Sequence, residues 1–296
     1  MNTQAVRVRD LRKTYGSRAV VDDVSFDIAH GETFALLGPN GAGKSTTVEI
    51  LEGFRRRTGG EVSVLGVDPA RGGLDWKARV GVVPQSTGAT GSFTVREQVR
   101  QFAGFYPRPR EVDDVLRAVG LQEQADSRIT KLSGGQKRRV DVALGIVGAP
   151  EVLFLDEPTT GFDPEARRDF WAMIRSLASD GTTILLTTHY LEEAEYLADR
   201  VGIIVDGRLR AIGPVDTIGG EVLRTPLVRW RDRGIEREER TADPGLFVAD
   251  LVARIGAEPD DVQIVRPTLE DIYLGLVADH AGAGHKDLAI QKEGSR

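Results

Sequence analysis

Residues 38–45 read Gly-Pro-Asn-Gly-Ala-Gly-Lys-Ser and follow a short apolar segment over residues 33–37. Two glycines with four residues between them, followed by lysine and serine, match the pattern of a phosphate-binding loop. Glycines at these positions let backbone N–H groups turn toward phosphate oxygens at the positive end of the next helix. We therefore expect a strand over 33–37, then the loop, then a helix from about Lys44 to Phe54.

Two side chains of this loop have specific expected roles. Lys44 is expected to reach the β- and γ-phosphates of a nucleotide, and the Ser45 hydroxyl is expected to bind Mg²⁺. The alternative is a glycine-rich turn that only begins a helix, and the strand–loop–helix order argues against it. The residues of this stretch that we expect to bind nucleotide are Gly38, Pro39, Asn40, Gly41, Ala42, Gly43, Lys44, Ser45 and Thr46.

A second apolar segment, residues 152–155, ends in two adjacent carboxylates, Asp156 and Glu157. Such a pair at the end of a buried strand is costly unless a cation or a reacting group uses it. We expect Asp156 to hold Mg²⁺, directly or through a water, and Glu157 to be the base that orients the attacking water. The alternative is a polar strand end that simply enters a loop. The presence of a phosphate loop in the same chain argues against this alternative.

The remaining pattern predicts an α/β fold with a parallel-sheet core. Apolar alternation over residues 6–26 indicates an antiparallel β-layer, and residues from about 86 to 149 indicate a helical insertion. Thr94 and Glu97 form a capping box that opens a helix through Tyr106. Further helices are expected over 111–119, about 133–147, and from Pro164 up to Gly181. Further core strands are expected over residues 80–83, 152–155, 182–187 and 201–205.

After about Gly220 a new series of predicted strands and helices begins, and it has no phosphate loop or carboxylate pair of its own. Strands are expected over 227–230, 235–240 and 262–265, and helices over 244–255 and 269–277. We therefore expect a nucleotide-binding domain over residues 1–219 and a small α+β domain over 220–279. The second domain is expected to be regulatory or dimer-supporting, and residues 280–296 are expected to be disordered.

Composition excludes several classes of site. The chain has 296 residues, a formal charge of −6 and no cysteine, so disulfides, thiolate metal sites and cysteine nucleophiles are excluded. The acidic total argues against a protein that coats nucleic acid. No apolar run approaches the roughly 20 residues that a membrane-spanning helix needs, and the first residues lack a signal-peptide run. We expect a chain that does not cross a membrane by itself.

Residues 132–136 read Leu-Ser-Gly-Gly-Gln and begin 24 residues before Asp156, at the start of a predicted helix. Ser133 and the N–H groups of Gly134 and Gly135 would form a second anion site there, although an ordinary glycine-containing N-cap is the alternative. With this string the chain resembles the ABC ATPase family, whose signature it is. The resemblance implies that Ser133, Gly134, Gly135 and Gln136 of one subunit cover the γ-phosphate of an ATP bound by the other.

Other positions take roles from the same resemblance. Gln85 matches the glutamine loop, which senses Mg²⁺ and the attacking water and contacts the transmembrane partner. His189 matches the switch histidine that contacts the γ-phosphate. Asp163 matches a loop that crosses the dimer interface, and it is equally suited to capping the helix at Pro164. Tyr15 matches an aromatic that stacks on adenine, with a solvent-side turn tyrosine as the alternative. Many family members have leucine where this chain has Phe162.

The resemblance covers residues from about 6 to 213 and implies ATP and Mg²⁺ as cofactors. It implies two partners, a second ATP-binding subunit in a homodimer and a separately encoded transmembrane permease, with no nucleic acid. The expected location is the cytoplasmic face of the membrane, through the permease. Within the family, residues 188–195 and 267–271 look most like the daunorubicin-resistance type of exporter. This implies efflux of a drug, an antibiotic or a lipid-like compound.

Two rival functions are compatible with parts of this pattern. An ABC import ATPase is compatible with Gln85 and with the short second domain. Among soluble, non-transport ABC ATPases, those of DNA repair carry a very long coiled coil between the phosphate loop and the signature. Here only 88 residues separate Lys44 from Leu132, and the chain has one of each motif, whereas translation-factor relatives have two cassettes. We therefore expect a transport ATPase, with export favoured over import.

Overall fold

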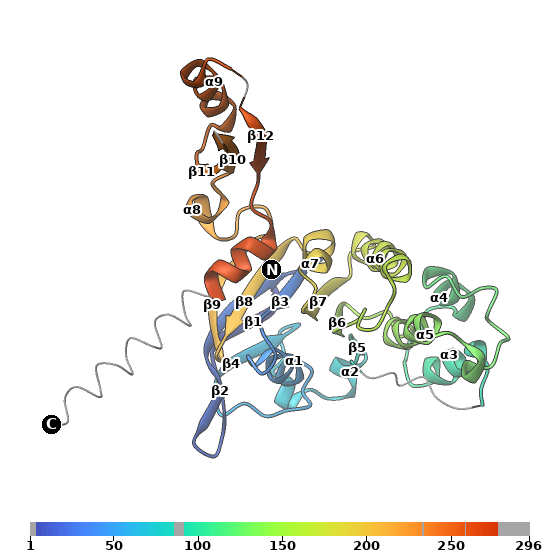
Figure 1. The fold of residues 1–296 in the computed structure, drawn as a ribbon. Coiled ribbons are helices and arrows are strands. Elements are labelled where there is room, and N and C mark those ends of the chain that lie inside the picture. The colour runs from blue at the N-terminus through green and yellow to red at the C-terminus, as the bar shows by residue number, and fades with distance from the viewer. Residues whose placement is uncertain (1–3, 86–91, 233, 258, 278–296) are drawn as a thin grey trace. The chain divides into compact units, whose positions relative to one another are not determined.

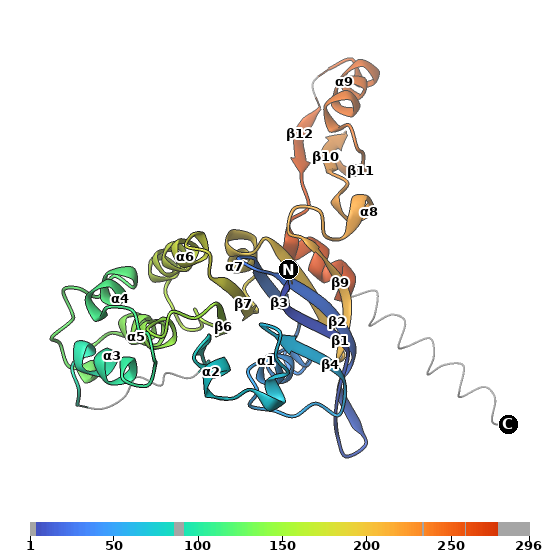
Figure 2. The same cartoon turned by 180° about the vertical axis from the view of Figure 1, so that it is seen from behind.

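The computed structural model describes residues 4–85, 92–232, 234–257 and 259–277. The chain divides into two compact units, residues 1–213 and 214–296, whose ribbons are drawn in Figures 1 and 2. The second unit begins earlier than the expected boundary after residue 219. Strand β9 (Arg208–Pro214), which the sequence analysis did not identify, extends the first unit's sheet up to the boundary. The segment after it belongs to the second unit because Arg224 donates to the carbonyl oxygens of Val215 and Ile218. The tail over residues 280–296, expected to be disordered, lies outside the described residues.

The first unit is built on a six-stranded sheet in the order β5-β6-β7-β3-β8-β9. The first five strands of this order, from β5 through β3 to β8, pair in parallel with their neighbours, as expected. The bounds are β3 Thr33–Leu37, β5 Val80–Val83, β6 Val152–Asp156, β7 Thr183–Thr188 and β8 Arg200–Val205. Because the carboxyl ends of parallel strands meet at one edge, the segments that follow β3, β5, β6 and β7 are brought together there.

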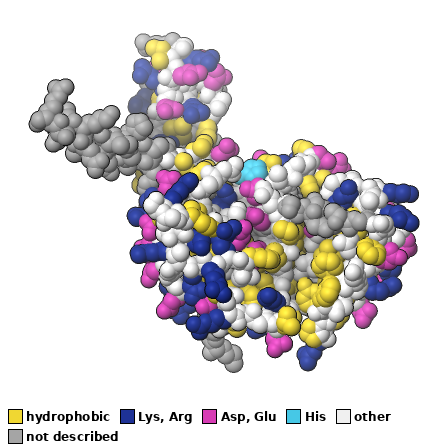
Figure 3. Space-filling view, turned by 90° about the horizontal axis from the view of Figure 1, so that it is seen from below, with side chains coloured by type: hydrophobic (Ala, Val, Ile, Leu, Met, Phe, Trp, Pro, Cys, Tyr) yellow, Lys and Arg dark blue, Asp and Glu magenta, His cyan; other side chains and the backbone are white. Residues whose placement is uncertain are grey.

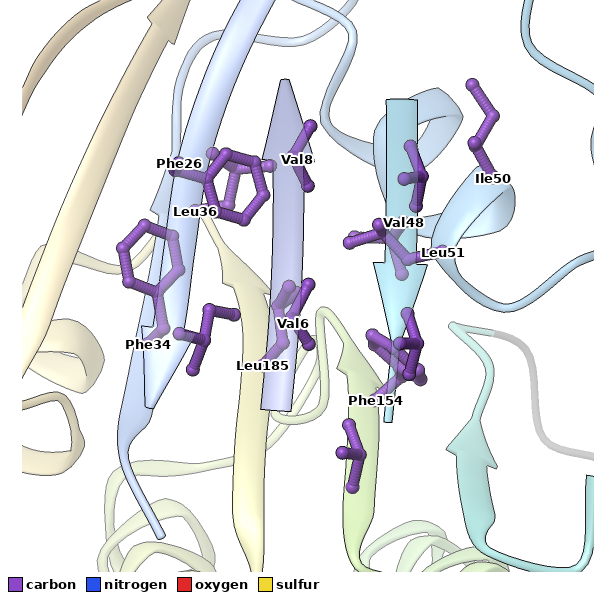
Figure 4. Packing of buried hydrophobic residues seen from close by; sticks show 14 of the residues in the cluster. Val6, Val8, Phe26, Phe34, Leu36, Val48, Ile50, Leu51, Phe154 and Leu185 are labelled. Atoms are coloured by element: carbon purple, nitrogen blue, oxygen red, sulfur yellow. The ribbon is translucent and has the colours of Figure 1, made fainter. Parts of the chain in front are cut away.

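An antiparallel layer of three strands packs against this sheet. It has the order β2-β1-β4, with β1 Gln4–Tyr15, β2 Arg18–Ala29 and β4 Gly59–Val64. Phe26 of β2 stacks on Phe34 of β3 with 5.2 Å between ring centroids. The same core contains Phe154 and residues of helix α1, Lys44–Leu51 (Figure 4). Each such side chain contributes roughly 1.5–3 kcal/mol when fully buried. This core holds the loop after β3 between the two layers.

The helices of the first unit begin where the caps predict. Thr94 and Ser133 each form a capping box, and Asp163 accepts a hydrogen bond from the N–H of Ala166. Two helices end earlier than expected: α1 stops at Leu51 because Gly53 turns left-handed against Pro69, and α3 loosens into i→i−3 bonds after Ala103. The bounds are α1 Lys44–Leu51, η1 Pro69–Arg71, α2 Leu74–Lys77, α3 Val95–Ala103, α4 Val112–Ala118, η2 Ile129–Lys131, α5 Gly134–Ile146, α6 Pro164–Ser179 and α7 Leu191–Leu197.

The second unit is a small α+β domain with the antiparallel sheet order β11-β10-β12. Trp230 of β10 packs on Phe247 of α9 with 5.4 Å between ring centroids, so α9 covers one face of this sheet. The bounds are α8 Gly220–Arg224, β10 Leu227–Asp232, β11 Ile235–Arg240, α9 Pro244–Ile255 and β12 Asp260–Val265. A final helix begins at Leu269 and continues to Val277, the last described residue. Among the described residues, no helix has the length and apolar character that crossing a bilayer requires.

Candidate functional site

The phosphate loop lies between β3 and α1, in the strand–loop–helix context that the sequence predicts. Gly38 and Gly43 have no room for a side chain, because a Cβ would lie 2.2 Å from the carbonyl oxygen of Ile204 and 2.6 Å from that of Val20. Gly41 and Gly43 also have φ values of 80° and 103°, which L-residues avoid. The loop backbone is therefore held tightly between β8 and β2, and its glycines are required by that packing.

Lys44, the first residue of α1, is only 5% exposed. Its ammonium donates to the carbonyl oxygens of Gly38 at 2.7 Å and Pro39 at 3.2 Å. Burial lowers the pKa of Lys44, and the charges of Glu157 and Asp156 act against that shift. An ammonium has three donors, and these two partners are neutral, so the site retains the positive charge that a phosphate group needs.

Asp156 at the end of β6 accepts a hydrogen bond from the Thr187 hydroxyl of β7. Burial raises the pKa of Asp156, while the Thr187 hydrogen bond lowers it. The described residues contain no group of three or more His, Cys, Asp or Glu side chains that could hold a metal ion. Magnesium is commonly held by one or two carboxylates together with substrate phosphates, so Asp156 and the exposed Ser45 suit it only alongside a bound nucleotide.

Two predicted residues, Gln85 and His189, converge on one carboxylate oxygen of a third, Oε2 of Glu157. The Gln85 amide donates to it at 2.8 Å, and Nδ1 of His189 lies 3.5 Å away. The Thr160 hydroxyl is at 3.4 Å, a contact that the sequence analysis missed. Gln85, Glu157 and His189 follow β5, β6 and β7, which are neighbours in the sheet. The edge of the parallel sheet therefore assembles a carboxylate, an amide and an imidazole from distant parts of the chain.

The backbone of Glu157 is unusual, with φ at 44° in the left-handed region. Its N–H donates to the carbonyl oxygen of Thr187 at 3.0 Å, next to the Thr187 hydroxyl at 3.2 Å. Left-handed conformations of non-glycine residues are uncommon and persist where the surroundings hold them. Thr187 thus contacts both acidic residues, and the two threonines that follow the aliphatic residues of β7 were the available sequence signal.

The signature segment, residues 132–136, forms the start of α5. The N–H of Gln136 donates to the Ser133 hydroxyl at 3.2 Å, and the N–H of Ser133 donates to the Gln136 side chain at 3.0 Å. The capping alternative is therefore realised within the chain. No hydrogen bond or ion pair of the described residues joins this segment to the phosphate loop. The N–H groups of Gly134 and Gly135 stand at the start of this helix, and their contact with nucleotide stays a prediction.

Two further predicted residues lie beside the site. Asp163 caps α6, while its neighbour Phe162 packs edge-on against Phe170 of the same chain. Tyr15 ends β1 and is 43% exposed. Arg55 donates to its hydroxyl, and the Lys13 ammonium lies 4.8 Å from its ring centroid. The interface role of Asp163 and the stacking role of Tyr15 remain predictions.

A buried network behind the site was also missed. Glu193 of α7 is fully buried and accepts hydrogen bonds from the Thr159 hydroxyl at 2.9 Å and the Trp171 indole at 2.8 Å. Burial raises the pKa of Glu193. The network joins the segment after Glu157 to the helix after His189, and it fixes both segments relative to α6.

Comparison with known proteins gives concordant results. A family model described as "ABC transporter" matches residues 21–160. The Nod factor export ATP-binding protein I of Paraburkholderia xenovorans (strain LB400) is 39% identical over 93% of this chain and 98% of its own length. Its name differs from the daunorubicin-resistance subgroup expected from the sequence.

Two solved structures share the fold. The structure of an ATP-binding subunit of an ABC transporter superposes with a TM-score of 0.68 at 26% identity, covering 92% of this chain and 99% of that chain. The cbiO1 protein of Clostridium perfringens, part of the cbiONQ ABC transporter complex, has a TM-score of 0.66 at 28% identity, covering 72% of this chain and 89% of that chain.

Proposed function

The chain belongs to the ABC transporter family as an ATP-binding subunit, and from this premise we propose that it hydrolyses ATP to drive export through a separately encoded membrane permease. The convergence of Gln85 and His189 on the carboxylate of Glu157 carries the proposal. A carboxylate held in this way can accept a proton from a water that attacks the γ-phosphorus, and the products are ADP and phosphate.

The other predicted residues supply binding. Lys44 and the N–H groups of the glycine-rich loop would hold the phosphates, and Tyr15 would stack on the base. Ser45, Asp156 and Gln85 would hold Mg²⁺, which neutralises phosphate charge when bound. The buried ammonium of Lys44 and the raised pKa of Asp156 fit this assignment, because each charge would gain a partner of opposite sign.

The second half of the site would come from a second copy of the chain. Within the described residues, no backbone hydrogen bond joins the helix start at Ser133 to the phosphate loop of the same chain. In a homodimer its N–H groups would cover the γ-phosphate held by the partner, and Asp163 would lie at the interface between the copies. ATP would then be bound by both subunits and would stabilise the contact between them.

The proposed transport direction rests on a relative, and the proposed partner rests on the exposed apolar surface. The relative from Paraburkholderia is named for export, which favours export over import. Figure 3 shows apolar side chains side by side on one face of the molecule. Phe54 and Phe105, which that view does not label, are 78% and 74% exposed. A permease could cover such surface, placing the chain at the cytoplasmic face of the membrane. A drug, an antibiotic or a lipid-like compound is the proposed class of substrate.

The test combines the chain with the permease encoded beside it in membrane vesicles. We expect MgATP to drive a lipophilic dye to the side of the membrane opposite the ATPase, and Glu157→Gln to abolish this while ATP still binds. ATP turnover of that variant should fall roughly 10²- to 10⁴-fold. Near-normal turnover would remove Glu157 as the base, and ATP-driven movement of substrate toward the ATPase side would establish import.

A further inference from the structure

Arg138 is the fifth residue of α5 and is only 4% exposed. Helix α5 packs against β5 and lies beside β6 (Figure 1). The guanidinium donates to three backbone carbonyl oxygens: Pro158 at 2.9 Å, Asp156 at 3.0 Å, and Pro84. Asp141, one turn further along α5, lies 3.7 Å from it. A charge this deeply buried persists only where its donors have partners, and here those partners belong to two different strand ends.

The three carbonyls surround the proposed catalytic groups. Asp156 and Pro158 stand on either side of Glu157, and Pro84 precedes Gln85. One side chain from the signature helix therefore holds the peptide groups that flank the base, together with the peptide that leads into the glutamine. Because the planar guanidinium has fixed donor directions, it sets the distance between the ends of β5 and β6 at this point.

Glu157 has a particular need for such support. Its φ of 44° lies in the left-handed region, which a residue with a side chain leaves unless its neighbours hold it. On one side Thr187 accepts its N–H. On the other side Arg138 holds the carbonyls before and after it. Without Arg138 the backbone can relax, and the carboxylate then turns away from Gln85 and His189.

We propose that Arg138 is a positioning residue for ATP hydrolysis, which aims the Glu157 carboxylate by linking the start of the signature helix to the ends of β5 and β6. This inference rests on the proposed function, in which Glu157 is the base. Arg138 itself contacts neither nucleotide nor water in this role. The position of α5 is thereby transmitted to the base through hydrogen bonds to the backbone.

The first test compares Arg138→Gln and Arg138→Lys with the matched control Arg139→Gln. Arg139 is the neighbouring arginine, but it donates to the carbonyl oxygen of Val119, away from the strand ends. We expect kcat to fall about 10- to 100-fold in Arg138→Gln, as displaced catalytic groups typically cause, with KM for ATP changed less than about threefold. Arg138→Lys keeps the charge but not the planar fork, so it should lose activity while folding normally. Control-like kcat in both Arg138 variants would overturn the proposal.

A double-mutant cycle separates positioning from general stability. When Arg138→Gln is combined with Glu157→Gln, single-turnover hydrolysis should fall less than about threefold further, because the aimed carboxylate is already gone. An equal loss in both backgrounds would show that Arg138 acts independently of Glu157, which contradicts the proposal.

Amide hydrogen exchange in the chain without nucleotide gives a readout independent of activity. Peptides covering residues 155–160 should exchange at least about tenfold faster in Arg138→Gln than in Arg139→Gln, because the local opening becomes easier. Unchanged exchange would refute the inference. If the parent chain shows no ATP hydrolysis, the proposed function fails instead, and the exchange measurement alone decides the role of Arg138.

Discussion

Glu52 follows α1 directly, and its carboxyl group offers a sharp thermodynamic test of the electrostatics around the site. Burial raises the pKa of Glu52 from its ordinary 4.5 to about 8, and the nearby charges of Asp156 and Glu49 act in the same direction. The perturbation is Glu52→Gln, which keeps the shape of the protonated group and removes its titration. We expect this variant to be more stable than the parent at neutral pH.

The direction in which folding stability changes with pH follows from proton binding to Glu52. Between pH 4.5 and 8 the folded chain holds a proton on Glu52 that the unfolded chain releases, so folding stability falls as pH rises through this window. At 1.36 kcal/mol per pH unit over the 2.5 units from 4.5 to 7, the upper limit is about 3.4 kcal/mol. Glu52 is half-buried, so solvent screening reduces this to an expected gain of about 1–2 kcal/mol for Glu52→Gln at pH 7.

The assay is urea unfolding of the parent and the variant at pH 5, 6, 7 and 8. The stability difference should be small at pH 5 and should grow with pH up to about 8. Glu49→Gln is the matched control: Glu49 pairs with Arg55, so its loss should be neutral or slightly destabilising, by ~0–1 kcal/mol. A difference between Glu52→Gln and the parent that stays constant across this range would refute the reasoning.

Three further outcomes are expected. Lys44→Ala should lose MgATP affinity at least about tenfold in equilibrium binding, because it removes a charge facing the phosphates, and unchanged affinity would displace Lys44 from the site. Ser133→Arg should bind ATP almost normally as a monomer but fail to form the ATP-bound dimer in size-exclusion chromatography. Loss of binding by that monomer would exclude assembly in trans. Truncation after residue 213 should preserve ATP binding and weaken dimer formation or coupling to the permease, and loss of binding by a truncated chain that is folded by circular dichroism would show that the second unit contributes to the nucleotide site.

Local patterns were sufficient to predict the parts of this chain whose structure depends on adjacent residues. The capping box at Thr94, the helix start at Ser133 and the phosphate loop are each encoded within a few residues, and each forms at its predicted position. Strand β4 was missed because its segment begins Gly-Gly-Glu and carries only two apolar residues. Its pairing with β1, far away in sequence, makes it a strand.

The arrangement of the site was predictable only in part, because its parts come from separate segments. The ends of β5, β6 and β7 could be identified individually, but nothing adjacent to Glu157 encodes its left-handed backbone. The run of three basic residues over 137–139 likewise contains no local signal that Arg138 is the buried one. Both features depend on which strands become neighbours, which single-sequence periodicity does not specify.

The strand order β5-β6-β7-β3 determines which sequence changes this protein can accept during evolution. The lateral distance between successive reactive groups is the spacing of adjacent strands, about 4.8 Å, and it does not depend on the length of the chain between them. Insertions in the connections should therefore leave the chemistry intact, provided that Arg138 keeps its place. A one-residue slip of β6 would instead turn Asp156 to the opposite face of the sheet and disable the enzyme at once. Natural variation in such a chain is expected to accumulate as length changes between strands and to be nearly absent within them.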